Sequence, residues 1–248
     1  MKNKIIIIAE AGGNHNGSIQ KAYKLVDIAK RAGADYIKFQ TFKADTLVSK
    51  NAPKAKYQKK NVKKISHYEL IKKLEMSNDM HVKLIKYCKR KKIKFLSSPF
   101  CVDSFNLLRK FNLDFIKIPS GEITNLPLLR HIKKFDNDII LSTGMSNTNE
   151  IKNDFKILKN KKRKIILLHC NTEYPTPLSD INLNAMRALK KQFNLDIGYS
   201  DHSLGIQVPI IAAALGAKVI EKHFTISKKM VGPDHVASLN PKELISMI

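Results

Sequence analysis

Two lysines, Lys38 and Lys117, stand inside short apolar runs, DYIKFQ and FIKIPS, where a charged amine is costly to bury. A buried lysine serves either as a Schiff-base amine or as a clamp for an anion. Hydroxyl residues near the ends of other runs would complete a site for phosphate and carboxylate groups: Ser120, Ser142 and Ser200. The alternative interpretation is structural, with each lysine paired to one of the acids Glu10, Glu122 and Glu221.

Two histidines end consecutive runs in the last quarter of the chain, His202 in GYSDHS and His223 in VIEKHFT. If these runs are neighbouring strands roughly 4.8 Å apart, both imidazoles can reach one metal ion. Two histidines with nearby carboxylates and water suit Mn²⁺ or another divalent ion, and they do not make a closed structural zinc site. His67, His81 and His131 fall in helical patterns, and we interpret them as surface residues.

The elements that would position these side chains alternate regularly along the chain. Runs rich in β-forming residues cover 4–11, 35–42, 93–100, 114–122, 138–144, 164–170, 196–202 and 218–225. Most are continuously apolar, which is typical of strands covered on both faces. Helical patterns separate them, most clearly over 18–32, where Ser18 can cap the helix and Gly33 can end it. Eight strand runs within residues 4–225, with helical patterns between them, predict an α/β fold, a (β/α)₈ TIM barrel. An open doubly wound sheet is the alternative, but no GxGxxG follows the first run.

The candidate residues fall where such a barrel places its function. In a (β/α)₈ barrel, functional groups gather at the C-terminal ends of the strands, and Glu10 ends the first run. Side chains two positions apart in a strand share a face, so Lys38 lies beside Gln40, and Glu221 beside His223. Charged groups on strand after strand therefore predict one polar pocket.

Two segments depart from this rhythm. Residues 43–80 form a long polar insertion, which either shapes the mouth of the pocket or is a mobile lysine-rich loop without a role. The last segment, PKELISMI, begins an eighth helix that we expect to be truncated.

Composition limits the other classes of function. Lysine and arginine number 45 against 21 acids, giving a net charge of +24, but only six are arginine, so the nucleic-acid signal is weak. No apolar run reaches 18 residues, which argues against a membrane span, and the apolar run near the N-terminus is better explained as a strand than as a signal peptide. Three cysteines without CxxC spacing favour a cytoplasmic location.

The sequence around these residues resembles a known protein family over essentially the whole chain. The segments that carry the resemblance are IIAEAGGNHNGS, GADYIKFQTFKADTL, FLSSPF, FIKIPSGEITNLPLL, IILSTGM, LLHCNTEYPTP, IGYSDHS, ALGAKVIEKHFT and GPDHVASLNPKEL. They are similar to the N-acetylneuraminate (sialic acid) synthase family, which includes the legionaminate and pseudaminate synthases. TEYPTP resembles the sialic and legionaminic branch.

The resemblance implies a transferase of polysaccharide biosynthesis. Such an enzyme condenses phosphoenolpyruvate with an N-acylated hexosamine, N-acetylmannosamine or a 2,4-diacetamido-trideoxyhexose, and consumes water. The products are a nine-carbon 2-keto-3-deoxy sugar acid and phosphate, which leaves with C–O cleavage. A divalent cation, expected to be Mn²⁺ with Mg²⁺ or Co²⁺ as alternatives, would be held by His202 and His223.

The resemblance also assigns roles to individual residues. Glu10 would orient water or a sugar hydroxyl, and Glu221 and Asp234 would lie beside the metal as further catalytic residues. Phosphate and carboxylate would be held by Lys38, Lys117, Ser120, Ser142 and Ser200, with help from Asn171 or Thr172. Contacts to the sugar would come from Gln40, Glu122 and Tyr174.

Family members usually continue into a C-terminal antifreeze-like domain. In the family's dimer that domain gives an arginine to the partner's sugar site, so the resemblance implies a homodimer for the full-length enzyme. We expect residues 1–248 to be the catalytic barrel, with this second domain absent from the chain.

Three alternatives remain open at this point. One is another phosphoenolpyruvate-dependent aldol-type synthase on the same barrel, with a phosphorylated aldose as acceptor. Another is an inactive truncated synthase. The third, a basic nucleic-acid-binding protein, has only the net charge in its favour; we expect no nucleic-acid and no membrane partner.

Overall fold

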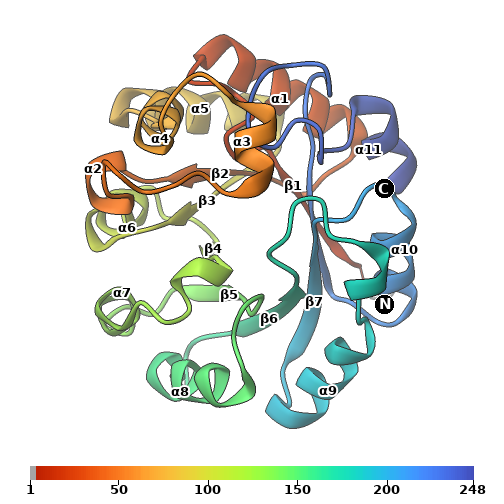
Figure 1. The fold of residues 1–248 in the computed structure, drawn as a ribbon. Coiled ribbons are helices and arrows are strands. Elements are labelled where there is room, and N and C mark those ends of the chain that lie inside the picture. The colour runs from red at the N-terminus through yellow and green to blue at the C-terminus, as the bar shows by residue number, and fades with distance from the viewer. Residues whose placement is uncertain (1–3) are drawn as a thin grey trace.

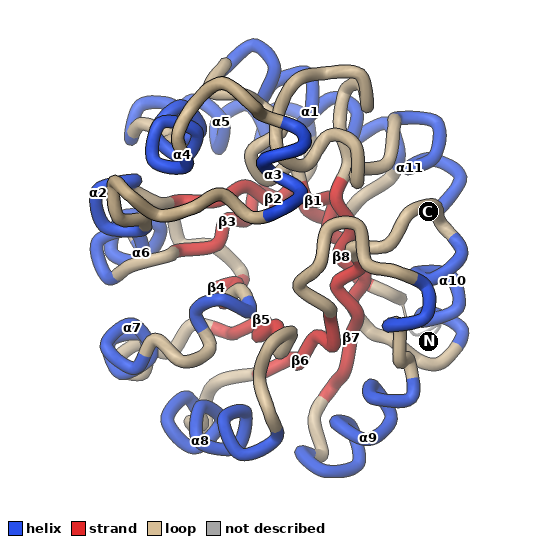
Figure 2. Tube along the Cα trace, in the orientation of Figure 1, coloured by secondary structure: helices blue, strands red, loops and turns tan. Residues whose placement is uncertain are grey.

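Eight parallel strands form a barrel with helices around it, as the computed structural model, which describes residues 4–248, shows in Figures 1 and 2. The hydrogen-bonded order is β3-β2-β1-β8-β7-β6-β5-β4, and β3 and β4 lie side by side where the ring closes. The strands are β1 (Ile6–Glu10), β2 (Tyr36–Thr41), β3 (Lys94–Pro99), β4 (Phe115–Ile118), β5 (Asp138–Ser142), β6 (Ile165–Cys170), β7 (Asp196–Asp201) and β8 (Val219–His223). The predicted (β/α)₈ barrel is confirmed.

Helices follow the strands, and most of these helices cover the outside of the ring. They are α1 (Ile19–Ala32), α2 (Ala44–Leu47), α3 (Lys56–Asn61), α4 (His67–Leu74), α5 (Asn78–Lys91), α6 (Val102–Arg109), α7 (Leu126–Ile132), α8 (Thr148–Leu158), α9 (Asn184–Phe193), α10 (Gln207–Ala214) and α11 (Pro241–Met247), with short 3₁₀ turns η1 (Ser120–Glu122) and η2 (Leu178–Asp180). The last helix, α11, packs against α1 and α10. Within residues 4–248, no helix is both long enough and apolar enough to cross a membrane.

Local signals in the sequence account for the helix ends. The Ser18 hydroxyl accepts a hydrogen bond from the Lys21 amide and so starts α1. Gly33, at φ +93°, ends the helix in the left-handed conformation that glycine adopts without strain. The apolar face of α1, which includes Leu25 and Val26, is buried against the strands. This packing fixes the helix on the barrel wall.

The core has an inner and an outer part because each strand is covered on both faces. Inside the barrel, a layer of apolar side chains closes the bottom: Ile8, Tyr36, Leu96, Ile140, Ile166, Leu168 and Val219. The register then sets polar partners opposite one another nearer the C-terminal ends, with Glu10 across from both Lys38 and His223, and Ser200 across from Glu221. The pairing therefore brings distant residues into one ring.

Two details of the sequence interpretation were wrong. The fourth strand ends at Ile118 rather than continuing to residue 122, because η1 begins directly after Pro119. His81 is fully buried rather than a surface residue. Its imidazole lies 2.8 Å from the Thr41 hydroxyl and 2.8 Å from the Ser77 carbonyl oxygen, so it joins α5 to β2.

The insertion at 43–80 is folded into helices. It contains α2, α3 and α4 and then leads into α5. The Ser66 hydroxyl and Glu69 make reciprocal hydrogen bonds with the backbone at the start of α4, and α3 lies beside the mouth of the barrel in Figure 1. Side chains of α3 reach the central cavity. Of the two interpretations of this insertion, the structure favours the one in which it shapes the mouth.

Candidate active site

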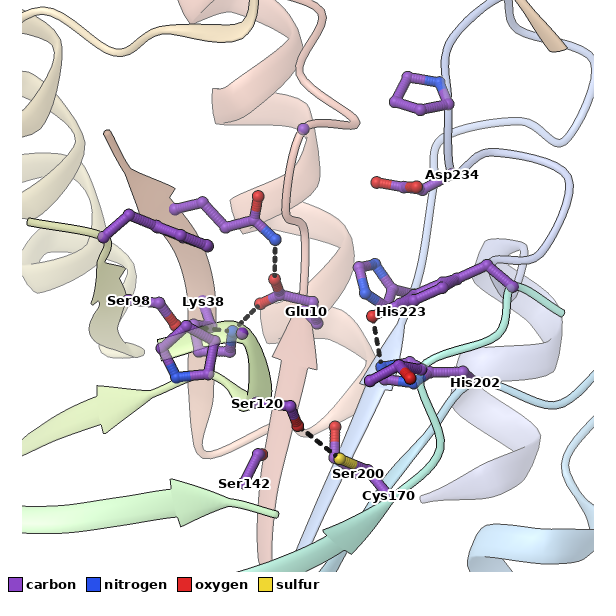
Figure 3. A pocket seen from close by; sticks show the side chains of 18 of the residues that line it. Glu10, Lys38, Ser98, Ser120, Ser142, Cys170, Ser200, His202, His223 and Asp234 are labelled. Atoms are coloured by element: carbon purple, nitrogen blue, oxygen red, sulfur yellow. Dashed lines mark hydrogen bonds and ion pairs between the residues drawn. The ribbon is translucent and has the colours of Figure 1, made fainter. Parts of the chain in front are cut away.

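A polar cavity of about 260 Å³ opens at the C-terminal ends of the strands. Side chains from all eight strands line it, together with residues from the loops that follow them. Figure 3 shows the labelled side chains converging on one space from different strands. The strand-end residues that line it are Glu10, Lys38, Gln40, Ser98, Lys117, Ser142, Cys170, Ser200, Glu221 and His223.

Two lysines and two glutamates form the base of the cavity. Lys38 Nζ lies 2.9 Å from Glu10 Oε2 and 3.7 Å from Glu221 Oε2. Lys117 Nζ lies 3.6 Å from the other oxygen of the same carboxylate, Glu221 Oε1. All four side chains are at most 6% exposed, so the surrounding water screens these charges very little.

The acids in this cluster differ in their preferred protonation states. Burial opposes ionisation of Glu221, but Lys117 and Lys38 outweigh it and hold the pKa of Glu221 below its usual range. Burial raises the pKa of Glu10 above its usual range; Lys38 opposes this shift and Glu221 adds to it. One carboxylate is therefore fixed as an anion, and the other can take up a proton more readily.

The pKa values of the two lysines are also shifted in opposite directions. Burial disfavours the ammonium form of Lys38, yet Glu10 and Glu221 outweigh burial and raise its pKa. Burial lowers the pKa of Lys117, and the positive charge of Lys38 adds to this shift while Glu221 offsets part of it. An anion arriving beside Lys117 would favour its charged form, which is the behaviour of a binding group.

Serine hydroxyls hold the lysines in place. Lys38 Nζ donates to Ser98 Oγ at 3.2 Å, and Lys117 Nζ donates to Ser142 Oγ at 2.7 Å. Ser200 donates to Glu221 Oε1 at 2.9 Å, whereas Lys38 lies nearer the other oxygen, Oε2. These contacts orient the amines toward the cavity with rotamers that are already fixed.

A second group of small side chains forms the floor beside β5 and β6. The Gly144 amide donates to Ser120 Oγ at 3.0 Å, and the same hydroxyl lies 2.9 Å from Cys170 Sγ. A Cβ at position 144 would stand 2.7 Å from both Ser120 Oγ and Thr172 Cγ2. A side chain at position 144 would therefore displace Ser120 or Thr172, which both line the cavity.

The two imidazoles lie together on one wall, with ring centroids 5.6 Å apart. The Tyr174 ring stands 4.1 Å from that of His202, and its hydroxyl lies 3.0 Å from His202 Nε2. Burial lowers the pKa of His202 to about 4 and lowers the pKa of His223 well below its usual value. Both rings are therefore neutral at physiological pH, the form in which histidine binds metals.

The pair fits a divalent cation as an open site. His202 Nδ1 donates to the Asn171 carbonyl oxygen, which leaves the lone pair on Nε2, and Nδ1 of His223 is buried without a hydrogen-bond partner. Among residues 4–248, no group of three or more His, Cys, Asp or Glu side chains could hold a metal ion. The protein would therefore supply two nitrogen ligands and leave the other positions to water or substrate.

The outer end of the cavity is formed by longer side chains. Asp234 lies beyond His223 at the opposite end of Figure 3 from Ser142, and burial raises the pKa of Asp234 to about 6. Tyr57 of α3 stacks on Tyr174, with ring centroids 5.4 Å apart. The cavity thus has a cationic base and an outer end with an acid and aromatic walls.

The structure places most of the predicted site residues in this cavity. Those lining it are Glu10, Lys38, Gln40, Lys117, Ser120, Ser142, Thr172, Tyr174, Ser200, His202, Glu221, His223 and Asp234. Glu122 lies outside the lining and accepts a hydrogen bond from Asn125 at 2.6 Å. The Asn171 side chain also turns away and donates to the Asp180 carbonyl oxygen at 3.0 Å.

Sequence reasoning missed some lining residues. Ser98 belongs to SSPF at the end of the third run, so its position at a strand end was the signal for its place beside Lys38. Tyr57 and Gln58 lie in the insertion, where no strand register relates them to the barrel. Only the folded path of α3 brings them to the mouth.

Comparison with known proteins gives the family. A protein-family model described as "NeuB family" matches residues 25–248. The chain belongs to the NeuB family. The family resemblance found in the sequence is thereby confirmed.

Several relatives align with nearly the whole chain. The N,N'-diacetyllegionaminic acid synthase of Campylobacter jejuni is 52% identical over 97% of this chain and 73% of its own length. The enzyme of the same name from Legionella pneumophila is 46% identical over 98% of this chain and 70% of its own length. These relatives are synthases, and the NeuB-family chain described here is a synthase-type enzyme of the same kind.

A solved structure supports the same grouping. The N-acetylneuraminic acid synthetase of Leptospira borgpetersenii, in complex with citrate, superimposes with a TM-score of 0.86 and 35% identity. The match covers 99% of this chain and 82% of that one. The family match in sequence and the structural match to this barrel therefore point to the same group of proteins.

Proposed function

We propose that this NeuB-family chain condenses phosphoenolpyruvate with an N-acylated hexosamine to give a nine-carbon 2-keto-3-deoxy sugar acid and phosphate. The observation that carries the proposal is the pair of buried lysines, each bonded to a serine, at the base of a cavity that also holds two neutral imidazoles. We assign residues 1–248 to the catalytic barrel of such a synthase. The absence of disulfides among the three cysteines supports a reducing, cytoplasmic setting.

The base of the cavity suits the small anion. Lys38 and Lys117 are the amines that would bind its phosphate and carboxylate, with hydroxyl donors at Ser142 and Ser120. Raising the pKa of Glu10 removes part of the negative charge that would repel the ligand. Desolvated donors held in fixed rotamers contribute more to binding an anion than they would in water.

The proposed reaction forms one carbon–carbon bond. C3 of phosphoenolpyruvate attacks the aldehyde carbon of the open-chain sugar, and the aldehyde oxygen takes up a proton. Water adds to C2 and loses a proton, and the C2–O bond then breaks to release phosphate. One water is consumed, and the electron pair of the broken bond leaves with the phosphate.

Glu10 is placed to handle a proton in this sequence. Its Oε1 accepts a hydrogen bond from Gln40 Nε2 at 3.2 Å, and its Oε2 pairs with Lys38. A carboxyl with a raised pKa at this position exchanges a proton near neutral pH more readily than an ordinary glutamate. We propose that Glu10 orients the water that adds to C2 and holds the proton it loses, while Glu221 stays ionised between the lysines.

His202 and His223 are the residues that would hold a divalent cation, with Mn²⁺ the proposed ion. When bound, the cation would act as a Lewis acid that polarises the aldehyde oxygen. The hydrogen bond from His202 Nδ1 to the Asn171 carbonyl oxygen fixes the tautomer and the orientation of that ring. The Tyr174 hydroxyl, which lies 3.0 Å from His202 Nε2, would give up that contact when the ion binds there. Because both imidazoles are neutral over the physiological pH range, both keep a nitrogen lone pair that can bind the ion.

The outer end of the cavity would take the sugar. Asp234 can accept hydrogen bonds from sugar hydroxyls, and Gln40 and the Tyr174–Tyr57 pair offer an amide and aromatic faces. The relatives from Campylobacter jejuni and Legionella pneumophila are N,N'-diacetyllegionaminic acid synthases, so a 2,4-diacetamido-trideoxyhexose is the proposed acceptor. N-acetylmannosamine is the second, because the similar Leptospira protein is an N-acetylneuraminic acid synthetase.

A phosphate-release assay tests the proposal. The protein is incubated with phosphoenolpyruvate, Mn²⁺ and one sugar at a time: the 2,4-diacetamido-trideoxyhexose, N-acetylmannosamine, its 6-phosphate, or arabinose 5-phosphate. We expect phosphate release that depends on an N-acylated acceptor, and a product whose mass equals both substrates plus water minus phosphoric acid. Release with arabinose 5-phosphate alone would instead support the phosphosugar alternative, and no release with any sugar would contradict the proposal.

A further inference from the structure

The loop over 225–240 carries Asp234 to the cavity without regular secondary structure of its own over most of its length. Its two ends are joined, because the Thr225 amide donates to the Leu239 carbonyl oxygen at 2.8 Å and the Leu239 amide donates to the His223 carbonyl oxygen at 2.9 Å. Between these ends, the position of Asp234 depends on contacts with other parts of the chain. The turn after β1, with the sequence GGNHNG, supplies several of them.

Asn14 holds the stem of this loop. Its amide nitrogen donates to the Phe224 carbonyl oxygen at 2.8 Å and to Ser238 Oγ at 2.9 Å. Ser238 in turn donates to the backbone carbonyl oxygen of Asp234 at 2.7 Å. Asn14 and Ser238 are at most 1% exposed, so this chain of hydrogen bonds from the turn after β1 to Asp234 is shielded from water.

Asn16 and His235 hold the tip. Asn16 Nδ2 donates to the Val231 carbonyl oxygen at 2.8 Å, which directs Asn16 Oδ1 toward His235 Nε2 at 3.3 Å. An amide oxygen only accepts, so Nε2 of His235 carries the proton, and Nδ1 accepts from the Thr225 hydroxyl at 2.6 Å. The imidazole therefore has one defined tautomer and joins the start of the loop to the turn after β1.

Close packing at Gly232 is an independent sign of the same arrangement. A Cβ there would stand 2.6 Å from His235 Cδ2 and 2.9 Å from Asn16 Oδ1. The backbone next to Asp234 thus rests directly on the two side chains that hold it. We name Asn14, Asn16 and His235 the loop clasp.

We propose that the loop clasp positions Asp234 for the acceptor sugar. The proposal rests on the proposed function, because it assigns the sugar to the outer end of the cavity. The clasp residues do not line the cavity, so they act through Asp234 as positioning residues. Loss of the clasp should weaken use of the acceptor and leave the binding of phosphoenolpyruvate at the base of the cavity almost unchanged.

The test uses Asn16→Gly and His235→Ala. Asn16 has φ +49°, which glycine adopts without strain, so the first variant removes the side chain but not the turn. Hydrogen exchange followed by mass spectrometry should show at least about tenfold faster exchange over 228–238, with β1 and α4 unchanged. His131→Ala is the control, since this half-buried histidine bonds to Asn106 on the outer helices.

Kinetics complete the test. Each clasp variant should raise the KM for the acceptor by about tenfold, while the dissociation constant for phosphoenolpyruvate by calorimetry changes less than twofold. In an Asp234→Asn background, the same clasp substitution should add almost nothing, since its effect passes through that carboxylate.

The outcomes separate the two proposals. Unchanged exchange over 228–238, or faster exchange with an unchanged acceptor KM, overturns the role of the clasp. An equal effect in the presence and absence of the Asp234 carboxylate also overturns it. Absence of turnover in the unmodified protein contradicts the proposed function instead, and the exchange measurement still decides whether the clasp orders the loop.

Discussion

Lys117→Met lowers kcat/KM for phosphoenolpyruvate by about 10²- to 10³-fold on this account. The Lys117 amine is buried, bonded to Ser142 and 3.6 Å from Glu221. Methionine fills a similar volume without a charge, so the variant leaves the ligand's phosphate or carboxylate without one of its two amines. Steady-state kinetics with saturating acceptor measure the loss, and calorimetry should show correspondingly weaker binding of phosphoenolpyruvate.

Lys222→Met is the matched control for that experiment. Lys222 is also a fully buried lysine, but it points away from the cavity and pairs with Asp201 and the Ser203 carbonyl oxygen. This variant should lose thermal stability and keep a KM for phosphoenolpyruvate close to that of the unmodified protein. If Lys117→Met affected the KM no more than the control does, the lysines would be structural and the anion site would be wrong.

His223→Ala is expected to abolish the stimulation of turnover by Mn²⁺. The structure offers two imidazole nitrogens and no larger cluster of ligands among residues 4–248. Loss of one imidazole therefore removes half of the ligands that the protein would supply to the ion. Binding of Mn²⁺, followed by the paramagnetic resonance signal of the free ion, should weaken on the order of 100-fold.

His169→Gln serves as the control for the metal experiment. His169 lies on β6 beside Tyr199, with ring centroids 5.5 Å apart, and it does not line the cavity. The control should bind Mn²⁺ as the unmodified protein does. Equal Mn²⁺ affinity in His223→Ala would show that the ion, if needed, binds elsewhere.

The barrel could be predicted from the sequence because its strands are buried on both faces. Continuous apolar runs such as IILLHC stand out from the lysine-rich helices, and their spacing gives the alternation. Strand ends were less certain. The fourth run kept an apolar and polar pattern past Ile118, and only the backbone shows the 3₁₀ turn after Pro119.

Much of the cavity could also be predicted, since parallel strands of a barrel end on one side. Lys38, Lys117 and Glu221 come together for that reason alone. Loop residues follow no such rule: Glu122 and Asn171 bond to other residues of their own loops, and Tyr57 comes from an insertion. The sequence did not predict that His81 is buried, because the pattern of the helix does not show which residue the imidazole contacts. In the structure that residue is Thr41 of β2.

The fate of the bridging oxygen of phosphoenolpyruvate tests the central claim most directly. Substrate labelled with ¹⁸O between C2 and phosphorus is turned over with the N-acylated acceptor and Mn²⁺, and the phosphate is analysed by ³¹P resonance. The account predicts that the label leaves with the phosphate, because the C2–O bond breaks, and that no phosphate forms without acceptor. Label retained in the keto acid, or phosphate released at the same rate without acceptor, would contradict it.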